Sequence, residues 1–333
     1  MRAIVVEPLE PLSLSSAPIT GVDTLASVNP LLLPLPTTVA GALGALVGIR
    51  LASEDPVKGL VELVEKLVER LRCRKPLLMG PLIQFSSGDS WSETMVSVSW
   101  SEFASPLCID SSSLFIDLVN CANRGGIAKL KPVIAYGVHL ERNAIEAGVV
   151  GEKKAKIGYL YRYPLLMYNL VSQYRETPAR PRFIYALNCD EDVGGYMRFG
   201  GEGRIAKVYT TSVDEARRLT SPLSLRPGLY IALSPVPLLP LDKLLLYLEF
   251  EKVVGLEFAR EVIGLLPKER GRTPKIAVEG IGLGFYEVKR VRRPAVLALP
   301  PGTVVKAESL SRPVGPVLEA LYSIGFASLY QLK

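Results

Sequence analysis

The sequence contains few of the residues that carry acid–base and metal chemistry. It has a single histidine, His139, and four cysteines, which show neither the spacing of a zinc site nor the density of a secreted disulfide scaffold. The carboxylates form no recurrent metal-binding spacing either. We therefore expect no metal, no cofactor and no enzymatic activity, and we expect the cysteines to be reduced in a cytoplasmic protein.

A continuous membrane-spanning segment is also missing. The uncharged run from Thr24 to Ile49 is interrupted by Pro30, Pro34 and Pro36, so only the part after Thr38 is free to form a helix. That part would measure roughly 18 Å, against about 30 Å for the hydrocarbon core of a bilayer. The N-terminus has no signal-peptide pattern. Membrane insertion and secretion are therefore not expected.

The composition predicts a folded, basic chain. Of the 333 residues 48% are hydrophobic and 22% charged, which suits a packed core rather than disorder. The 39 basic and 33 acidic residues leave a net charge of +6, which favours polyanionic partners without identifying them. Only three glutamines are present, a scarcity of thermolabile amides compatible with a thermophilic source.

Hydrophobic patterns predict an α+β chain with two units. A strand pattern at Arg2–Val6 precedes two helix patterns, one beginning at Thr37 or Thr38 and one at Asp55. Short strand patterns follow, and both halves combine strands with a few helices. The polar stretch Arg142–Lys156 predicts an extended hairpin or insertion that can reach a partner. The basic, proline-containing stretch Tyr174–Arg182 is the predicted linker, which gives domains at residues 1–176 and 177–333.

Five segments, in order along nearly the whole chain, resemble one protein family. They are Leu33–Gly48, Gly158–Tyr168, Gly200–Arg204, Arg292–Val305 and Ile324–Tyr330. Together they resemble the third Cmr subunit of type III-B CRISPR effector complexes, in the RAMP superfamily. The resemblance implies two tandem ferredoxin-like (RNA-recognition-motif-like) domains with inserted hairpins and loops. It also implies a non-catalytic role in antiviral defence.

The resemblance further implies particular partners. These are the repeat-derived 5′ tag of the guide RNA, the large polymerase-like Cmr subunit and an adjacent backbone Cmr subunit. A homo-oligomer is not expected.

Two glycine-containing segments are candidate RNA contacts. In Gly200–Arg204 the glycines allow close backbone approach, so amides can meet phosphate oxygens while Arg204 supplies charge. The alternative is a tight strand connection. At the second segment a helix start offers unpaired amides and hydroxyls; capping and burial are the alternative. The candidate residues are Gly200, Gly201, Gly203 and Arg204 in the first segment, and Thr37, Thr38 and Gly41 in the second.

Two basic segments complete the candidate RNA-binding set. The first interleaves cations with Tyr159, Tyr161 and Tyr163, which suits phosphate contacts and base stacking, although a solvated face with core tyrosines would give the same pattern. The second is the basic run Lys289–Pro294, which could equally be solvated. The candidates are Arg142, Asn143, Lys153, Lys154 and Arg162 in the first segment, and Arg292 and Arg293 in the second.

Two other functions remain open from the sequence. One is a metal-independent endoribonuclease that processes guide RNA, with His139 as general base and Lys153 stabilising the transition state. The other is a ribonucleoprotein module outside CRISPR systems. RNA cleavage would distinguish the first, and RNA binding without affinity for a Cas partner would distinguish the second.

Overall fold

The computed structural model describes most of the chain. The described residues are 2–14, 31–88, 90–117, 121, 126–141, 154–172, 175–201, 203–240, 253–308 and 315–332. In parts of the strands, including residues 134–141 and 154–164, only the backbone is described. Among these residues strands predominate over helices, so the expected mixture of both kinds of element is confirmed.

The N-terminal part of the chain builds a large antiparallel sheet. At its centre β10 pairs with β1 on one side and β2 on the other, and β1 pairs in turn with β12. These strands are β1 (Arg2–Pro8), β2 (Cys73–Ser87), β10 (Arg175–Cys189) and β12 (Ile205–Ser212). Beyond them lie β3 (Ser90–Trp91), β4 (Val96–Ser97), β5 (Glu102–Ala104), β8 (Ile127–Glu141), β9 (Lys154–Ser172) and the edge strand β11 (Gly194–Arg198).

Two helices cover one face of this sheet. They are α1 (Pro36–Leu46) and α2 (Lys58–Leu71). In α2 the apolar residues recur at helical spacing, and Leu60, Val64 and Leu67 are buried in one cluster with Ile4 and Phe183 of the sheet. Among the described residues, none of the helices combines the length and the apolar character needed to cross a bilayer.

The α2 helix begins where the sequence signals a start. The Asp55 carboxylate accepts hydrogen bonds from the amides of Val57 and Lys58, at 2.7 and 2.9 Å. These bonds satisfy amides that have no partner within the helix and lower the pKa of Asp55 below its usual value. The helix predicted to start at Asp55 is thus confirmed, apart from its first residues.

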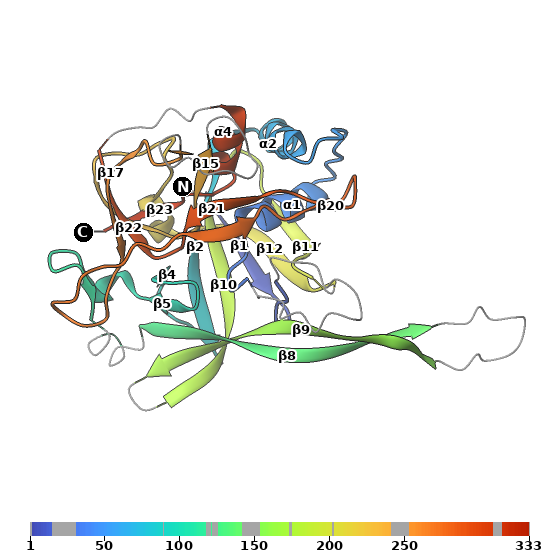
Figure 1. Cartoon of the computed structure of the whole chain (residues 1–333), viewed down its shortest axis with the longest axis horizontal. Coiled ribbons are helices and arrows are strands. Elements are labelled where there is room, and N and C mark those ends of the chain that lie inside the picture. The colour runs from blue at the N-terminus through green and yellow to red at the C-terminus, as the bar shows by residue number, and fades with distance from the viewer. Residues whose placement is uncertain are drawn as a thin grey trace, which may run out of the picture.

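The C-terminal part of the chain forms two smaller antiparallel sheets and a helix. The larger runs in the order β13 (Leu219–Thr220), β23 (Leu329–Gln331), β14 (Gly228–Ala232), β22 (Thr303–Ala307) and β17 (Ala259–Leu265). The smaller runs β16 (Val253–Val254), β15 (Val236–Pro240), β21 (Ala295–Leu299) and β18 (Glu279–Gly282). Helix α4 (Pro316–Ser323) contacts α2 and β2 (Figure 1).

Several short elements lie in the connections between these strands. They are the pairs β6 (Ile109–Asp110) with β7 (Phe115–Ile116) and β19 (Phe285–Tyr286) with β20 (Val291–Arg292), and the 3-10 helices η1 (Pro106–Cys108) and η2 (Asp214–Arg218).

An apolar layer joins the large sheet to the C-terminal sheet. Val5 and Ile184 of the large sheet lie in one buried cluster with Ile231 and Val304 of the C-terminal sheet, and each is at most 2% exposed. The two faces therefore pack on each other, and the helices lie on the opposite face of the large sheet.

The segment predicted to be a linker is part of the large sheet. From Arg175 onward it belongs to β10, whose residues from Pro181 to Leu187 are almost all buried. The expected domain boundary at residue 176 falls inside this strand, and the C-terminal sheets begin at Leu219. The proline and arginine content suggested a linker, but in the strand Arg180 is exposed and Arg182 half-buried at alternating positions, while Pro181 between them is buried.

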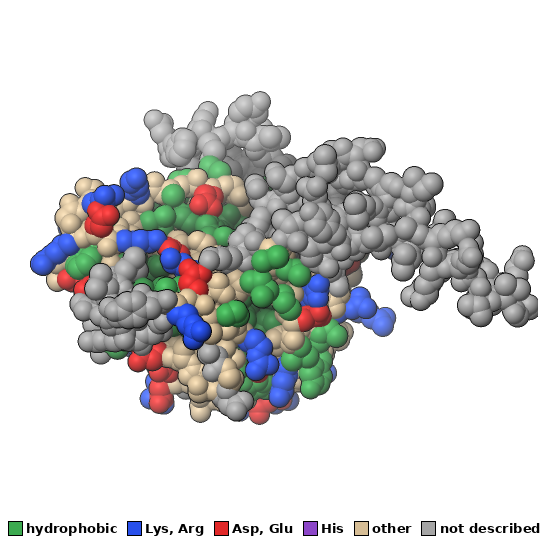
Figure 2. Space-filling view, turned by 90° about the horizontal axis from the view of Figure 1, so that it is seen from below, with side chains coloured by type: hydrophobic (Ala, Val, Ile, Leu, Met, Phe, Trp, Pro, Cys, Tyr) green, Lys and Arg blue, Asp and Glu red, His purple; other side chains and the backbone are tan. Residues whose placement is uncertain are grey.

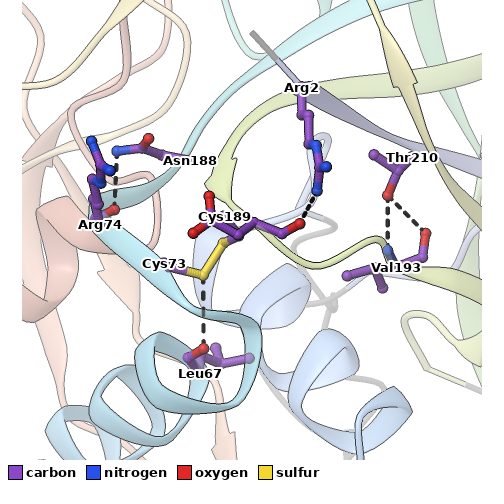
Figure 3. The surroundings of a disulfide bond; sticks show 9 residues. Arg2, Leu67, Cys73, Arg74, Asn188, Cys189, Val193 and Thr210 are labelled. Atoms are coloured by element: carbon purple, nitrogen blue, oxygen red, sulfur yellow. Dashed lines mark hydrogen bonds between the residues drawn. A yellow bond between two sulfur atoms is a disulfide. The ribbon is translucent and has the colours of Figure 1, made fainter.

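The four cysteines, which were expected to be reduced, form two disulfides. Cys73 at the start of β2 bonds to Cys189 at the end of β10 (Figure 3). Cys108 bonds to Cys121. Cys73 and Cys189 are 116 residues apart in sequence but directly opposite in register. Beside the disulfide, Asn188 donates a hydrogen bond to the carbonyl of Arg74, and Arg2 donates one to the carbonyl of Asp190. The expectation of reduced cysteines was wrong because spacing along the chain does not reveal strand pairing.

We predict that the Cys73–Cys189 disulfide stabilises the protein substantially. It closes a long loop in the unfolded chain, so the double substitution C73S/C189S should lower the free energy of unfolding by roughly 3–5 kcal/mol. The double substitution C108S/C121S is the matched control. Because its disulfide closes a shorter loop, its loss of unfolding free energy should be smaller than that of C73S/C189S by about 1–2 kcal/mol. Urea denaturation of both variants measures the difference, and equal losses would contradict the prediction.

Candidate nucleic-acid interface

The most prominent feature is a long hairpin formed by β8 and β9. Figure 1 shows this ribbon extending away from the rest of the chain. Its strands pair from Ile127 with Val171 to Glu141 with Lys154. Of the stretch Arg142–Lys156, for which the sequence predicted a hairpin or insertion, residues 154–156 belong to β9, and the candidates Arg142, Asn143 and Lys153 lie outside the described residues.

Along β9 the candidate residues occupy alternating positions. Tyr161 and Tyr163 lie opposite Gly137 and Ala135, so the small residues of one strand face the tyrosine positions of the other. Arg162 lies between them. Successive residues of a strand alternate between its faces, so the tyrosine positions share one face and Arg162 is on the other. Tyr136 of β8 lies opposite Arg162, so one face of the ribbon carries the Tyr161 and Tyr163 positions and the other carries an aromatic and a basic position together.

The glycine-rich segment around residue 200 packs against the N-terminal strand connection. The Gly201 amide donates a hydrogen bond to the Ser13 carbonyl at 2.7 Å. A Cβ at Gly200 would lie 2.7 Å from the same carbonyl oxygen. Arg204 forms an ion pair with Glu10. The Gly201 amide and the Arg204 guanidinium, which were expected to contact a phosphate, thus have partners within the protein, as expected for a tight strand connection. Gly203 is exposed.

At the start of α1, amides that were candidates for RNA contact are also hydrogen-bonded within the protein. The amides of Thr38 and Val39 donate to the Leu35 carbonyl at 2.9 and 3.2 Å. Thr37 is buried, its hydroxyl has no hydrogen-bond partner among the described residues, and Gly284 packs against it. A side chain on Gly284 would meet this hydroxyl at 3.4 Å. Of this candidate group, Gly41 is the residue that faces open space.

Arg293 is a buried anchor in the structure. Its guanidinium donates to the carbonyls of Pro56 at 3.1 Å and Phe285 at 2.9 Å, and it lies 5.0 Å from the ring centre of Tyr286. Burial lowers the pKa of Arg293 and raises that of Tyr286, whose hydroxyl donates to the Ser53 carbonyl. These contacts tie the β19–β20 hairpin to the loop before α2. Its neighbour Arg292 is exposed on β20.

Many of the other exposed cations pair with carboxylates. Figure 2 shows one face of the molecule, on which Lys and Arg side chains are separated by acidic and hydrophobic ones and form no continuous basic surface among the coloured residues. The pairs are Arg2–Asp192, Lys66–Glu62, Arg72–Glu191, Lys75–Glu319, Arg217–Asp214, Arg260–Glu308, Lys268–Glu102, Arg272–Glu269 and Lys289–Glu54.

One exposed group, on β11 and β12, is not among the residues predicted from the sequence. Tyr196 is 67% exposed, and Lys207 lies directly opposite it. Arg198 and Tyr209 continue the same face. The signal was present as alternation, because polar or aromatic residues alternate with buried ones in both strands. Short strands with so few cations did not stand out as a basic segment.

His139 is the residue on which the endoribonuclease alternative depends. The only histidine of the sequence, His139, lies in β8 where the register shifts between Val138 and Leu140, and its side chain is not described. Within the described part of the chain, no group of three or more His, Cys, Asp or Glu side chains is arranged to hold a metal ion.

Comparisons with known proteins identify the fold. No protein-family model and no curated protein sequence matches the chain. A chain of the type III-B Cmr-beta complex bound to cognate target RNA superposes with a TM-score of 0.57 at 18% identity, covering 100% of this chain and 97% of that one.

Two further structures give additional comparisons. A chain of Cmr-beta bound to cognate target RNA and AMPPnP gives a TM-score of 0.54 at 19% identity, with coverages of 92% and 86%. A chain of the Csm3–Csm4 subcomplex of a type III-A interference complex gives 0.41 at 11% identity, covering 100% of both chains, which is too low to support an argument. This chain therefore shares the fold of chains found in Cmr-beta complexes.

We predict that Arg293 matters for stability whether or not RNA is present. Replacing it with alanine leaves the Pro56 and Phe285 carbonyls without this donor, so R293A should lower the free energy of unfolding by about 2–4 kcal/mol. The exposed neighbour supplies the control, since R292A should change stability by less than about 0.5 kcal/mol. Urea denaturation without RNA measures both, and a silent R293A would refute the anchoring role.

Proposed function

We propose that this chain is a non-catalytic, RNA-binding subunit of a type III-B CRISPR effector complex that acts in antiviral defence. The observation that carries the proposal is the superposition on a chain of an RNA-bound Cmr-beta complex over the full length of this chain. The five sequence segments that resemble the third Cmr subunit support the finer assignment.

The strand order supports tandem ferredoxin-like units. The strands β1, β2, β10 and β12 are numbers 1 to 4 of this unit in chain order. Across the sheet they lie in the order β12, β1, β10, β2, which is 4-1-3-2. In the C-terminal sheet β14, β17, β22 and β23 follow the same arrangement. This is the antiparallel order of a ferredoxin-like sheet. Helices lie between the first and second strands of the first unit, and α4 lies between the third and fourth strands of the second.

The β8–β9 hairpin is the element best placed to contact guide RNA. It projects from the sheet, so it can follow a nucleic-acid strand without distorting the core (Figure 1). Its sequence interleaves Lys154 and Arg162 with tyrosines, a combination that suits phosphates and unstacked bases. In the proposed role it holds the repeat-derived 5′ tag, while other surfaces dock the large polymerase-like subunit and the adjacent backbone subunit.

The disulfides are compatible with a cytoplasmic role in a thermophile. Disulfides are rare in the cytoplasm of mesophiles, but intracellular proteins of hyperthermophiles are an exception. The scarcity of glutamine points in the same direction. We therefore propose that the protein is cytoplasmic and comes from a thermophile, in which an intracellular protein can contain disulfides.

The proposal predicts guide-RNA binding that depends on the hairpin. Crosslinking to labelled guide RNA carrying the 5′ tag should give tag-dependent products with intact RNA, and the candidate large subunit should co-purify. The triple variant K153A/K154A/R162A should bind roughly tenfold more weakly, because lost phosphate contacts release fewer counterions. It should also reduce the slope of log affinity against log salt by about 2.

Controls for this experiment come from cations elsewhere on the surface. R260A/R270A/R272A removes the same number of charges from the C-terminal part of the chain and should leave affinity nearly unchanged. RNA cleavage that H139A abolishes would instead establish an endoribonuclease. RNA binding with no affinity for the large subunit would indicate a ribonucleoprotein module of another kind.

A further inference from the structure

The outer face of β11 and β12 carries an exposed aromatic and basic group. It consists of Tyr196 and Arg198 on β11 and Lys207 and Tyr209 on β12, named here the β11–β12 face. Tyr196 and Lys207 are directly opposite in register, and Tyr209 lies opposite Gly194. Because antiparallel partners point to the same side of a sheet, all four side chains lie on one face.

The inner sides of the same strands explain this exposure. Met197, Ala206 and Val208 are buried in the core beneath the sheet. Helix α1 packs under β11, where Leu46 comes within 3.3 Å of the position a Cβ on Gly195 would occupy. The strands are therefore held from below by apolar packing, and their outward side chains are free of any structural task in that core.

The C-terminal sheet covers the neighbouring strands but leaves this part of the sheet open. It buries Val5 of β1 and Ile184 of β10, while Tyr209 is only partly buried against the same cluster. One strand further out, Tyr196 is 67% exposed. The C-terminal sheet thus covers this side of the large sheet at β1 and β10 but leaves the β11–β12 face, at the edge, exposed to solvent.

The cations of this face are available to a ligand. Within the described residues neither Arg198 nor Lys207 forms an ion pair, unlike the many paired cations elsewhere on the surface. The Lys207 ammonium lies 5.5 Å from the ring centre of Tyr209. Glu7 of β1 is the carboxylate opposite Lys207 in register, so these side chains keep a net positive charge.

This combination matches the chemistry of single-stranded RNA. An exposed tyrosine on a sheet offers a flat ring on which an unstacked base can lie, and adjacent cations can contact the phosphates on either side. Gly194 leaves the space beside the Tyr209 position free of a side chain. A protein interface would have an apolar core inside a polar rim, whereas on this face the exposed aliphatic residue Ile205 lies directly opposite Arg198.

We propose that the β11–β12 face binds single-stranded RNA, with a base stacked on Tyr196 and phosphates held by Arg198 and Lys207. The site is separate from the β8–β9 hairpin and goes beyond the proposed function, although it rests on that function for the nature of the ligand. It gives the chain a second contact with an RNA strand.

Binding of the full-length protein to a fluorescein-labelled single-stranded RNA, followed by anisotropy, tests this site. Y196A should weaken binding roughly 5- to 30-fold, whereas Y196F, which keeps the ring, should stay within about twofold of the original protein. K207A should reduce the salt dependence of binding. Photocrosslinking followed by mass spectrometry should place a crosslink on the peptide that contains Tyr196.

The control variant is L107A. Leu107 is 68% exposed, as much as Tyr196, but lies in η1 away from this face, so its removal should leave affinity unchanged. Thermal unfolding of each variant verifies folding, which is not at risk because Tyr196 is exposed. If Y196A binds RNA as tightly as L107A does, the site is refuted while the proposed function stands.

The remaining outcomes are also distinct. If the original protein does not bind RNA, the proposed function fails, and the β11–β12 face loses its ligand with it. If Y196A keeps RNA affinity but no longer captures the large subunit, the face is a protein contact and the RNA assignment is overturned.

Discussion

The packing of the large sheet against the C-terminal sheet is the constraint on which the rest of the structure depends. Residues such as Val5, Ile184, Ile231 and Val304 come from strands far apart in the sequence and are almost completely buried between the sheets. A buried side chain of this size contributes about 1.5–3 kcal/mol relative to exposure, so separating the sheets would expose a large apolar area. The two parts of the chain therefore act as one body.

This interface determines which surfaces remain for partners. It removes most of one face of the large sheet from solvent, and α1 and α2 cover the other face. What remains accessible is at the margins, namely the β8–β9 ribbon on one side and the β11–β12 face on the other. Met197 and Val208 fix the β11–β12 face to the core, and Ala128 and Tyr168 fix the base of the β8–β9 ribbon, so both margins are anchored by buried residues.

The same packing determines which basic residues have partners inside the protein and which are free to bind a ligand. Arg293 holds backbone carbonyls beneath the β19–β20 hairpin and Arg204 pairs with Glu10, so their charges are used inside the molecule. Arg198 and Lys207 have no such partners among the described residues. Local charge density, which marks Lys289–Pro294 as basic, does not distinguish these classes, because the distinction depends on what lies opposite each side chain.

The sequence by itself determined the mixture of strands and helices and the start of α2 near Asp55. These features follow from periodicity and capping, which act over a few neighbouring residues. Only the tertiary structure decided that Cys73 meets Cys189, that residues 175–182 form a strand, and that Arg292 is exposed while Arg293 is buried. The reason is physical: these outcomes depend on strand register and on packing between residues distant in the sequence, 116 positions apart for Cys73 and Cys189 and 237 for Pro56 and Arg293, which local patterns do not encode.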